Sequence, residues 1–265
     1  MRVQVQGTGT PVRRIGLGPG EETEVLIDVQ GVAALAAALE DAEKDPSCRV
    51  MVVEGTPGVF CSGMDLGFAT SATEQELLDQ VRGFARCLAM MRSSKRVVIS
   101  VVDGEAVGGG VGLAAAADVC LATERSSFAL PELVLGLVPA VVLPVLLHRV
   151  LPQKVRLMCF SAAIRPAEAL AWGLVDRVVE GPGELEKAVR SAIKHCLRCS
   201  PRAVAELKAV SAGGGRDLPE ALEAGAEHMV RWFLDDEATL RALEGFLDGE
   251  ALPWFDRYRP EGTSR

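Results

Sequence analysis

The sequence predicts an α/β fold with a mainly parallel sheet, followed by a helical C-terminal part. Two runs rich in β-branched residues, 49–54 (RVMVVE) and 96–102 (RVVISVV), have the continuous hydrophobicity of strands buried on both faces. Residues 31–44 have the Ala- and Leu-rich amphipathic pattern of a helix. Because strands alternate with helices, we expect β-α-β crossovers, and these connections produce parallel pairing.

The elements of the N-terminal half follow from its hydrophobic runs and from the glycines and prolines between them. Strands are expected over residues 2–17, 24–28, 49–54, 96–102 and 118–122. Helices are expected over residues 31–44, 73–91 and 111–117. The segment 55–65 is rich in Gly and Pro and is predicted to be a loop.

After Pro131 the pattern becomes almost entirely helical. Helices are expected over residues 140–150, 152–160, 166–172, 184–197, 201–212, 218–234 and 237–247. One short apolar strand is expected at 174–178. The sequence therefore divides into an α/β half and a helical half.

The composition excludes several classes of protein. With 265 residues, 49% of them apolar, the chain can bury a core that needs no disulfide or metal. A formal net charge of -8 argues against a nucleic-acid groove, which needs clustered Lys and Arg. No apolar run reaches the roughly 18 residues of a membrane span, and the first residues, MRVQVQGTGT, lack the apolar core of a signal peptide. We therefore expect a cytoplasmic protein that binds neither nucleic acid nor a membrane.

The counts of reactive side chains narrow the possible chemistry. Seven cysteines, an odd number, suit a reducing compartment. Cys196 and Cys199 lie beside His195, but no second pair follows them, so a helix explains the spacing better than a zinc site does. We expect neither a metal nor a cofactor. With 3 His and 1 Tyr, the chain offers few acid/base groups other than carboxylates.

Two glycine-containing loops follow predicted strands, where α/β sheets usually open their ligand crevices. They span residues 59–66 and 104–112. Glycine at the start of a helix allows close approach to exposed N–H donors at the positive end of the helix dipole. Such a segment suits an oxyanion hole or a phosphate. Consecutive glycines in the middle of the chain match neither a Rossmann fingerprint nor a Walker loop.

Glu132 stands alone in an apolar stretch, residues 127–140 (SFALPELVLGLVPA). Burial raises the pKa of a carboxyl group toward neutrality, which suits a group that must both take and give a proton. The alternative is a surface glutamate near the start of a helix, since the position after Pro131 is comfortable for any acid.

Together these segments resemble the crotonase, or enoyl-CoA hydratase/isomerase, superfamily over most of the chain. Residues 60–66 (FCSGMDL) resemble the family's first oxyanion loop, and residues 103–110 (DGEAVGGG) resemble its second. Further similar segments follow in the family's order: 116–119, 131–132 and 167–176. The resemblance implies that the N–H groups of Met64 and Gly109 form the oxyanion hole. It also implies that substrate is bound by Cys61, Gly63, Asp65, Gly108, Gly110 and Leu137.

The resemblance also implies a fold and a type of chemistry. It implies a ββα spiral core with the active site over residues 1–200, and a helical extension over residues 201–265 that builds trimers, often paired into hexamers. The shared chemistry is stabilisation of a thioester enolate. Because the enolate oxygen is charged only transiently, N–H donors fixed in advance favour the transition state over bound substrate.

Hydratases of this family usually carry two glutamates, and this chain matches only one of them. Gly112 stands where the first is expected, and Glu132 stands at the second. Members with one glutamate act as isomerases or specialised dehydratases. The chain is most similar to the dehydratases of polyketide β-branching, which act on a hydroxymethylglutaryl group carried by an acyl carrier protein. The similar segments are 62–65, 104–107, 130–140, 143–144 and 252–254.

On this hypothesis Glu132 takes a proton from Cα of the carrier-bound 3-hydroxy-3-methylglutaryl group. The same carboxyl group, or a water that it orients, protonates the departing hydroxyl and leaves a 3-methylglutaconyl group. The expected partner is an acyl carrier protein with a phosphopantetheine-linked acyl group, or a CoA thioester. The expected assembly is a homotrimer or hexamer.

Three other functions stay open. An enoyl-CoA isomerase or hydratase acting on free CoA thioesters would use Glu132 in the same way. A β-branching decarboxylase of the same fold is expected to carry Lys, Tyr or His near the first loop, and residues 66–73 contain none of these. A non-catalytic trimer that binds acyl thioesters would explain the missing first glutamate, but not the retained Glu132 and glycine motifs.

Basic residues are candidates for binding the anionic parts of a substrate. His148 and Arg149 lie near the glutamate segment, although an arginine at a helix C-terminus more often satisfies the helix dipole. The groups 92–96 and 154–156 resemble solvated helix ends. They are also the candidates for contact with a phosphate or an acidic partner.

Overall fold

Two structural units make up the chain, residues 1–196 and residues 197–265. The computed structural model describes residues 1–19, 24–161, 163–212, 238, 241–242, 245, 248–251 and 253. In the second unit it describes helix α9 (Pro201–Ala212), which confirms the helix predicted at 201–212. The helix predicted at 218–234 and most of the one predicted at 237–247 lie outside the described residues, as does most of the segment 252–254.

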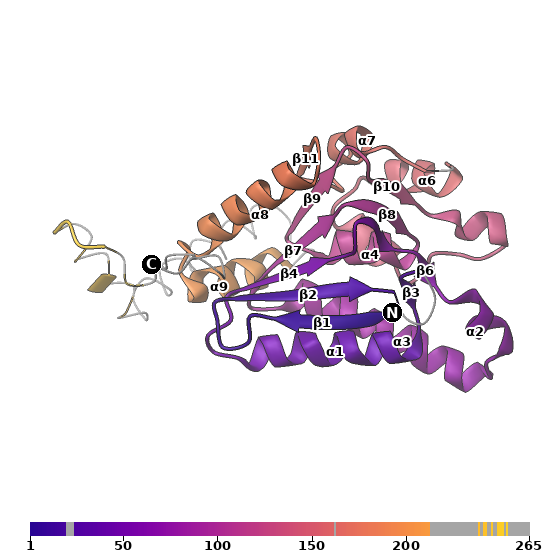
Figure 1. Cartoon of the computed structure of the whole chain (residues 1–265), viewed down its shortest axis with the longest axis horizontal. Coiled ribbons are helices and arrows are strands. Elements are labelled where there is room, and N and C mark those ends of the chain that lie inside the picture. Colours follow the sequence, from indigo (N-terminus) through magenta and orange to yellow (C-terminus); the bar gives the residue numbers. More distant parts are fainter. Residues whose placement is uncertain are drawn as a thin grey trace, which may run out of the picture. The chain divides into compact units, whose positions relative to one another are not determined.

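The largest sheet of the first unit has the strand order β1-β2-β4-β7-β9-β11. Its strands are β1 (Arg2–Gln6), β2 (Val12–Gly18), β4 (Val50–Glu54), β7 (Val97–Val102), β9 (Val119–Thr123) and β11 (Arg177–Val179). β1 and β2 are antiparallel, and each later pair of neighbours is parallel. The prediction of a mainly parallel sheet is therefore confirmed, and Figure 1 shows its strands.

Shorter parallel strands form two further sheets in the described part of the first unit. β5 (Gly58–Cys61), β8 (Gly104–Val107) and β10 (Ser127–Ala129) have the order β10-β8-β5, and β3 (Leu26–Ile27) pairs with β6 (Gly63–Met64). The prediction that 55–65 form a loop was wrong for β5 and β6. Strands of two to four residues are too short to show a hydrophobic period in the sequence. They are strands because they pair with parallel partners from other parts of the chain. Each of β4, β7 and β9 is thus followed by a short strand of a second sheet.

Helix α4 (Gly109–Ala116) packs against β5, β6 and β8, the strands of the glycine loops, and helix α3 (Glu74–Ser93) packs between α4 and α1 (Val29–Lys44), which lies along β1 (Figure 1). α1 begins two residues earlier than predicted, because the Asp28 side chain caps it by accepting the Gly31 N–H. α3 begins at a capping box formed by Thr73 and Glu76. α4 is buried from its second residue to its end, as its Gly, Ala, Val and Leu composition requires.

The hydrophobic core fills the space between the large sheet and its helices. Ile15 and Val53 of the sheet, Leu35 of α1 and Leu113 of α4 are fully buried and belong to one cluster. Cys61 of β5 belongs to the same cluster. The core therefore continues beneath the first glycine loop and gives that loop a fixed base.

After β10 the first unit is helical except for β11, and its first helix is shorter than predicted. The elements are the 3-10 turn η1 (Pro131–Leu135), α5 (Leu143–Leu147), α6 (Pro152–Phe160), α7 (Pro166–Ala171) and α8 (Pro182–Cys196). The helix predicted at 140–150 shrinks to α5, because Pro144 is tolerated only in the first turn of a helix. Within the described segments, every helix falls short of the length and apolar character that a bilayer crossing requires.

Candidate active site

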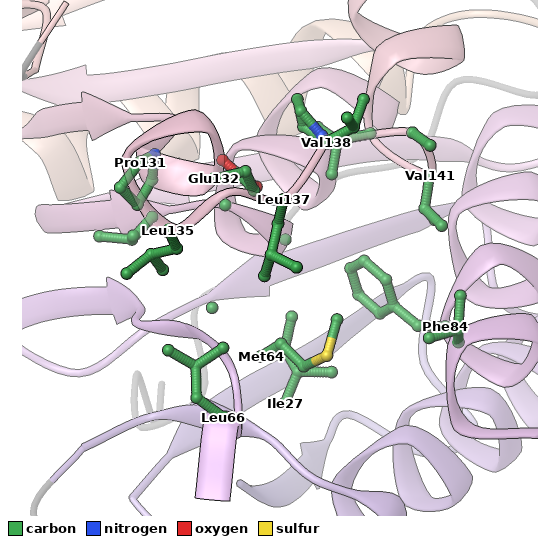
Figure 2. Close-up of a pocket in the computed structure, with 18 of the residues that line it drawn as sticks. Ile27, Met64, Leu66, Phe84, Pro131, Glu132, Leu135, Leu137, Val138 and Val141 are labelled. Atoms are coloured by element: carbon green, nitrogen blue, oxygen red, sulfur yellow. The ribbon is translucent and has the colours of Figure 1, made fainter. Parts of the chain in front are cut away.

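Segments far apart in the sequence meet at a cavity of about 400 Å³. Its wall is built from residues of 62–66, 107–109 and 131–142, completed by Ile27 of β3 and by Gln80, Val81 and Phe84 of α3. Figure 2 shows the side chains of several of these residues around the open space. The two glycine loops and the glutamate segment that the sequence singles out therefore converge on one cavity.

The predicted site residues divide into those that line this cavity and those that support it. The lining set contains Gly63, Met64, Gly108, Gly109, Glu132 and Leu137. Cys61, Asp65 and Gly110 are not among the lining residues. Cys61 is fully buried, and Asp65 is the N-cap of α2 (Leu66–Ser71), where its carboxylate accepts the Phe68 N–H at 3.0 Å. These three residues hold the loops in place from behind.

The glycines at the start of α4 are required by close packing. A β-carbon on Gly109 would lie 2.3 Å from Cδ1 of Ile27 and 3.1 Å from Cζ of Phe84. A β-carbon on Gly110 would lie 2.6 Å from the carbonyl oxygen of Cys61. A real β-carbon does not come as close as 2.3 or 2.6 Å to another heavy atom, and the Cys61 oxygen, which belongs to the backbone, cannot move aside as the end of the Ile27 side chain can. The start of α4 can therefore rest directly on β5 because Gly110 carries no side chain.

The N-terminus of α4 borders the cavity through Gly108 and Gly109. The carbonyl of Gly108 accepts the N–H groups of Val111 (3.0 Å) and Gly112 (3.3 Å), which are the first hydrogen bonds of the helix. The N–H of Gly109 comes before the first of these bonds and, like other N–H groups at a helix start, has no acceptor within the helix. Gly109 also lines the cavity. The positive end of the helix dipole therefore faces this space and favours a developing negative charge.

Met64 also lines the cavity, and its backbone N–H is a second candidate donor. The Asp65 N–H is hydrogen-bonded to the carbonyl of Ile27 on the paired strand β3, at 3.4 Å. Successive N–H groups of a strand point to opposite sides, so the N–H of Met64 points away from β3. Gly63, the residue before Met64, has a φ of +91°, and its backbone N–H donates a hydrogen bond to the sulfur of Cys61. Burial raises the pKa of that thiol to about 11, so Cys61 stays protonated at neutral pH.

The Glu132 carboxyl group lies directly over Gly108. A β-carbon on Gly108 would be 3.0 Å from Oε1 of Glu132, and the φ of Gly108, +51°, is also a conformation that favours glycine. Oε2 of Glu132 is buried and has no hydrogen-bond partner among the described residues. Burial raises the pKa of Glu132, although its own backbone N–H opposes the rise. The alternative of a surface glutamate does not fit this placement.

We expect the raised pKa of Glu132 to make the stability of the protein depend on pH. Because the folded state binds this proton more tightly than the unfolded chain does, Glu132 lowers the free energy of unfolding as pH rises through its folded pKa. Glu132→Gln removes this loss. The stability advantage of the variant over the parent should therefore grow from acidic toward neutral pH, as measured by urea unfolding of both proteins. A difference that stays flat or shrinks with rising pH would contradict the burial of this group.

The position of the missing glutamate is filled by apolar side chains. Gly112 is buried in α4, and a β-carbon there would lie 3.3 Å from both Cγ atoms of Val142 and 3.4 Å from Cδ1 of Leu88. Val142 is 4% exposed and also lines the cavity. A second carboxylate at this position would need space that Val142 and Leu88 occupy. The described wall of the cavity therefore carries one carboxyl group, that of Glu132.

The basic residues suggested by the sequence lie elsewhere. Arg149 donates to the carbonyl of Ala117 at 2.8 Å and to the carboxylate of Asp176 at 2.6 Å, and neither Arg149 nor His148 lines the cavity. The groups 92–96 and 154–156 do not line it either. Lys154 instead lies over the ring of Trp172, 5.0 Å from its centroid. Arg149 joins elements of the fold and is not a ligand for a distal carboxylate.

The contribution of α3 to the cavity was not predicted from the sequence. Gln80, Phe84, Leu88 and Met91 form one buried face of this helix at spacings of three and four residues. Gln80 is the polar member of that face. A polar residue at a core position is a signal that could have marked the helix, but the sequence does not show which loop the helix faces.

Comparison with known proteins identifies a matching family and several named relatives. The family model described as enoyl-CoA hydratase/isomerase matches residues 26–257. A protein named carnitinyl-CoA dehydratase from Salmonella arizonae is 34% identical over 188 residues, which cover 70% of this chain and 71% of the relative. The protein of the same name from Proteus mirabilis is 34% identical over 169 residues, and there the match covers 63% of this chain and 64% of the relative.

Solved structures agree over nearly the whole chain. An enoyl-CoA hydratase/isomerase from Marinobacter aquaeolei superposes with a TM-score of 0.84 at 25% identity, covering 96% of this chain and 99% of that chain. Pseudomonas aeruginosa AtuE superposes with a TM-score of 0.85 at 26% identity and the same coverage. The order of sheets and helices described above is therefore shared with these proteins.

Proposed function

Since the chain belongs to the enoyl-CoA hydratase/isomerase, or crotonase, family, we propose that it interconverts 3-hydroxyacyl and 2-enoyl thioesters of coenzyme A, with Glu132 as acid and base. The predicted family, its fold and its enzymatic character are confirmed. The observation that carries the proposal is the Glu132 carboxyl group over Gly108, next to the first N–H of α4 and across from Met64.

In the proposed reaction the thioester oxygen lies between the N–H groups of Met64 and Gly109. Glu132 takes the proton from Cα, and the electron pair of the broken C–H bond moves into an enolate whose oxygen the two N–H groups stabilise. The enolate then expels the 3-hydroxyl, to which Glu132 returns the proton, so that water leaves and the carboxylate is restored. Each N–H donor contributes about 3 kcal/mol to such a transition state.

One carboxyl group can perform both proton transfers only if Cα and the leaving oxygen are on the same face of the substrate. In the proposed reaction Glu132 performs both transfers, because Val142 and Leu88 fill the place of a second carboxylate. Its raised pKa supports both roles, since a group that titrates near the working pH can take and give a proton. The geometry therefore supports a syn elimination.

The character of the cavity supports a neutral acyl chain. Among the described lining residues Glu132 is the charged one, and most of the others are apolar. The relatives named carnitinyl-CoA dehydratase support a CoA thioester and a dehydration reaction. A charged acyl group would need a partner in the wall, and the charged side chain that the described wall offers, Glu132, is used by the proposed reaction. We therefore propose an uncharged 3-hydroxyacyl chain.

A second candidate is dehydration of a hydroxymethylglutaryl group on an acyl carrier protein. The run 130–140 followed by Leu143 and Pro144 supports it, since this is the part of the cavity wall that the sequence matches to that subfamily. A distal carboxylate, however, meets no basic side chain among the described lining residues. Dehydration of the carrier-bound group therefore stays a prediction. For the alternative of a β-branching decarboxylase, the described lining of this cavity gives no support.

One assay separates these functions. The protein is incubated with 3-hydroxyacyl-CoA esters of neutral chains and, separately, with hydroxymethylglutaryl-loaded carrier protein, and the products are weighed by mass spectrometry. The proposal expects loss of water from a CoA ester with no loss of carbon dioxide. Dehydration of the carrier-bound group alone would favour the second candidate, and binding without turnover of any thioester would favour the non-catalytic alternative.

We further propose that the protein is a homotrimer or hexamer in which residues 201–265 take part. Exposed apolar side chains of the first unit support association: Val134 is 87% exposed, Phe160 75% and Val138 66%. Sedimentation equilibrium that finds a monomer would contradict this proposal.

A further inference from the structure

The wall of the cavity holds a buried polar group that the proposed reaction does not use. Gln80 of α3 lines the cavity and is 4% exposed. The residues that share its buried helix face, such as Phe84 and Leu88, are apolar. A buried amide is unfavourable unless its donor and acceptor are both hydrogen-bonded, so the partners of Gln80 need to be accounted for.

Only the donor side of this amide is satisfied within the described chain. Nε2 of Gln80 donates to the carbonyl oxygen of Ile27 at 2.8 Å. A carbonyl oxygen can only accept, so this contact fixes the orientation of the amide, with Nε2 toward Ile27 and Oε1 away from it. Oε1 is buried and has no hydrogen-bond partner among the described residues. An unpaired acceptor therefore lies within an otherwise apolar part of the cavity wall.

The position of Gln80 relates it to the reacting atoms. It precedes Phe84 by one turn of α3, about 5.4 Å along the helix axis. The ring of Phe84 in turn lies against Gly109, where a β-carbon would be 3.1 Å from Cζ. A thioester held at the Gly109 N–H would therefore have Gln80 within the length of a short acyl chain.

We propose that Oε1 of Gln80 accepts a hydrogen bond from a hydroxyl group that the substrate carries on its acyl chain beyond the reacting carbons. This inference rests on the proposed function, because it takes the thioester to be bound at Gly109. Gln80 is then a specificity-determining residue for the acyl group. It favours a hydroxylated chain over a hydrocarbon chain of the same length, and it disfavours a terminal carboxylate, whose oxygens only accept.

Matched acyl-CoA pairs test this without turnover. Each pair has a terminal hydroxyl in one member and a methyl group in its place in the other: 4-hydroxybutanoyl with pentanoyl, 5-hydroxypentanoyl with hexanoyl, and 6-hydroxyhexanoyl with heptanoyl-CoA. These saturated esters lack a 3-hydroxyl and cannot be dehydrated. Isothermal titration calorimetry should show that the parent binds the hydroxyl member of at least one pair about 10- to 100-fold more tightly than its methyl counterpart.

Two substitutions separate the acceptor from the contact with Ile27. Gln80→Met removes Oε1 and Nε2 and should abolish the preference for the hydroxyl member. Gln80→Glu also removes the Nε2 donor but keeps an acceptor oxygen, and it should retain the preference. Gln75→Met is the matched control, because Gln75 is an exposed residue of the same helix, and it should leave binding unchanged. If Gln80→Met does not fold, the parent and Gln80→Glu still give the comparison.

Several outcomes overturn the inference. Tighter binding of the methyl member by the parent in all three pairs, or equal binding of both members, would do so. An undiminished preference in Gln80→Met, or its loss in folded Gln80→Glu, would also do so. Binding of the thioesters without any preference refutes the role of Gln80 alone, whereas failure of every thioester to bind the parent refutes the proposed function as well.

Discussion

Replacing Glu132 with Gln is expected to lower turnover of the thioester substrate by at least about 100-fold, the size of a lost general acid/base. Glu132 is the charged side chain among the described residues that line the cavity, and its carboxyl group lies over Gly108. Glutamine has nearly the same shape but does not take up the proton from Cα. Steady-state kinetics measure the effect, and circular dichroism verifies the fold.

Glu105→Gln is the matched control for this experiment. Glu105 belongs to β8 in the same glycine motif, but it is exposed and does not line the cavity. Its replacement should leave turnover and stability close to those of the parent, as surface substitutions usually do. Turnover of Glu132→Gln above about a tenth of the parent's would contradict the assigned role. Retained binding of acyl-CoA by the variant would show that only the chemistry is lost.

Replacing Gly110 with Ala is expected to lower turnover by about 100-fold through displacement of a neighbouring donor. The new β-carbon would lie 2.6 Å from the carbonyl oxygen and 2.9 Å from the β-carbon of Cys61. Since that oxygen belongs to the backbone of β5, it cannot rotate away, and the start of α4 has to move. The Gly109 N–H moves with it. Overpacking should also lower the free energy of unfolding by about 1–3 kcal/mol.

Gly112→Ala is the matched control, two residues further along α4. Its β-carbon would meet only the side-chain atoms of Val142 and Leu88, at 3.3–3.4 Å, and these can adjust. We expect a smaller change in turnover and in urea unfolding than Gly110→Ala causes. Because the oxyanion donors act on the transition state, kcat of Gly110→Ala should fall more than KM changes. A variant with parental kcat would refute the requirement for close packing at Gly110.

The sequence allowed the large sheet to be predicted, but not the two smaller ones. Residues 49–54 and 96–102 are long enough for their hydrophobic runs to identify buried strands. β5 and β6 together span six residues around Ser62 and contain two glycines. Their strand conformation comes from pairing with β8 and β3, which lie far away in the sequence. Local patterns do not record such pairings.

The candidate site could be predicted where backbone chemistry defines it. The glycine run and Glu132 lie in segments that resemble the family's motifs, and the structure brings them to one cavity. Phe84 and Gln80 could not be placed in the same way. Their contribution depends on which face of α3 meets the cavity, and this is decided by packing between distant segments. Cys61 was predicted to bind substrate from the resemblance of residues 60–66 to the family's first loop, whereas its side chain lies in the core.

The carbonyl group of Ile27 accepts hydrogen bonds from both the Asp65 N–H and the Gln80 side chain, and Cδ1 of Ile27 fills the space beside Gly109. Both proposed oxyanion donors and the helix that lines the acyl chain are therefore tied to one residue. For protein engineering, this means that enlarging the cavity from the side of α3 should also shift the catalytic donors. Variants with altered substrate range are better sought at Leu135, Leu137 and Val138, exposed side chains of the cavity wall that belong to a different segment.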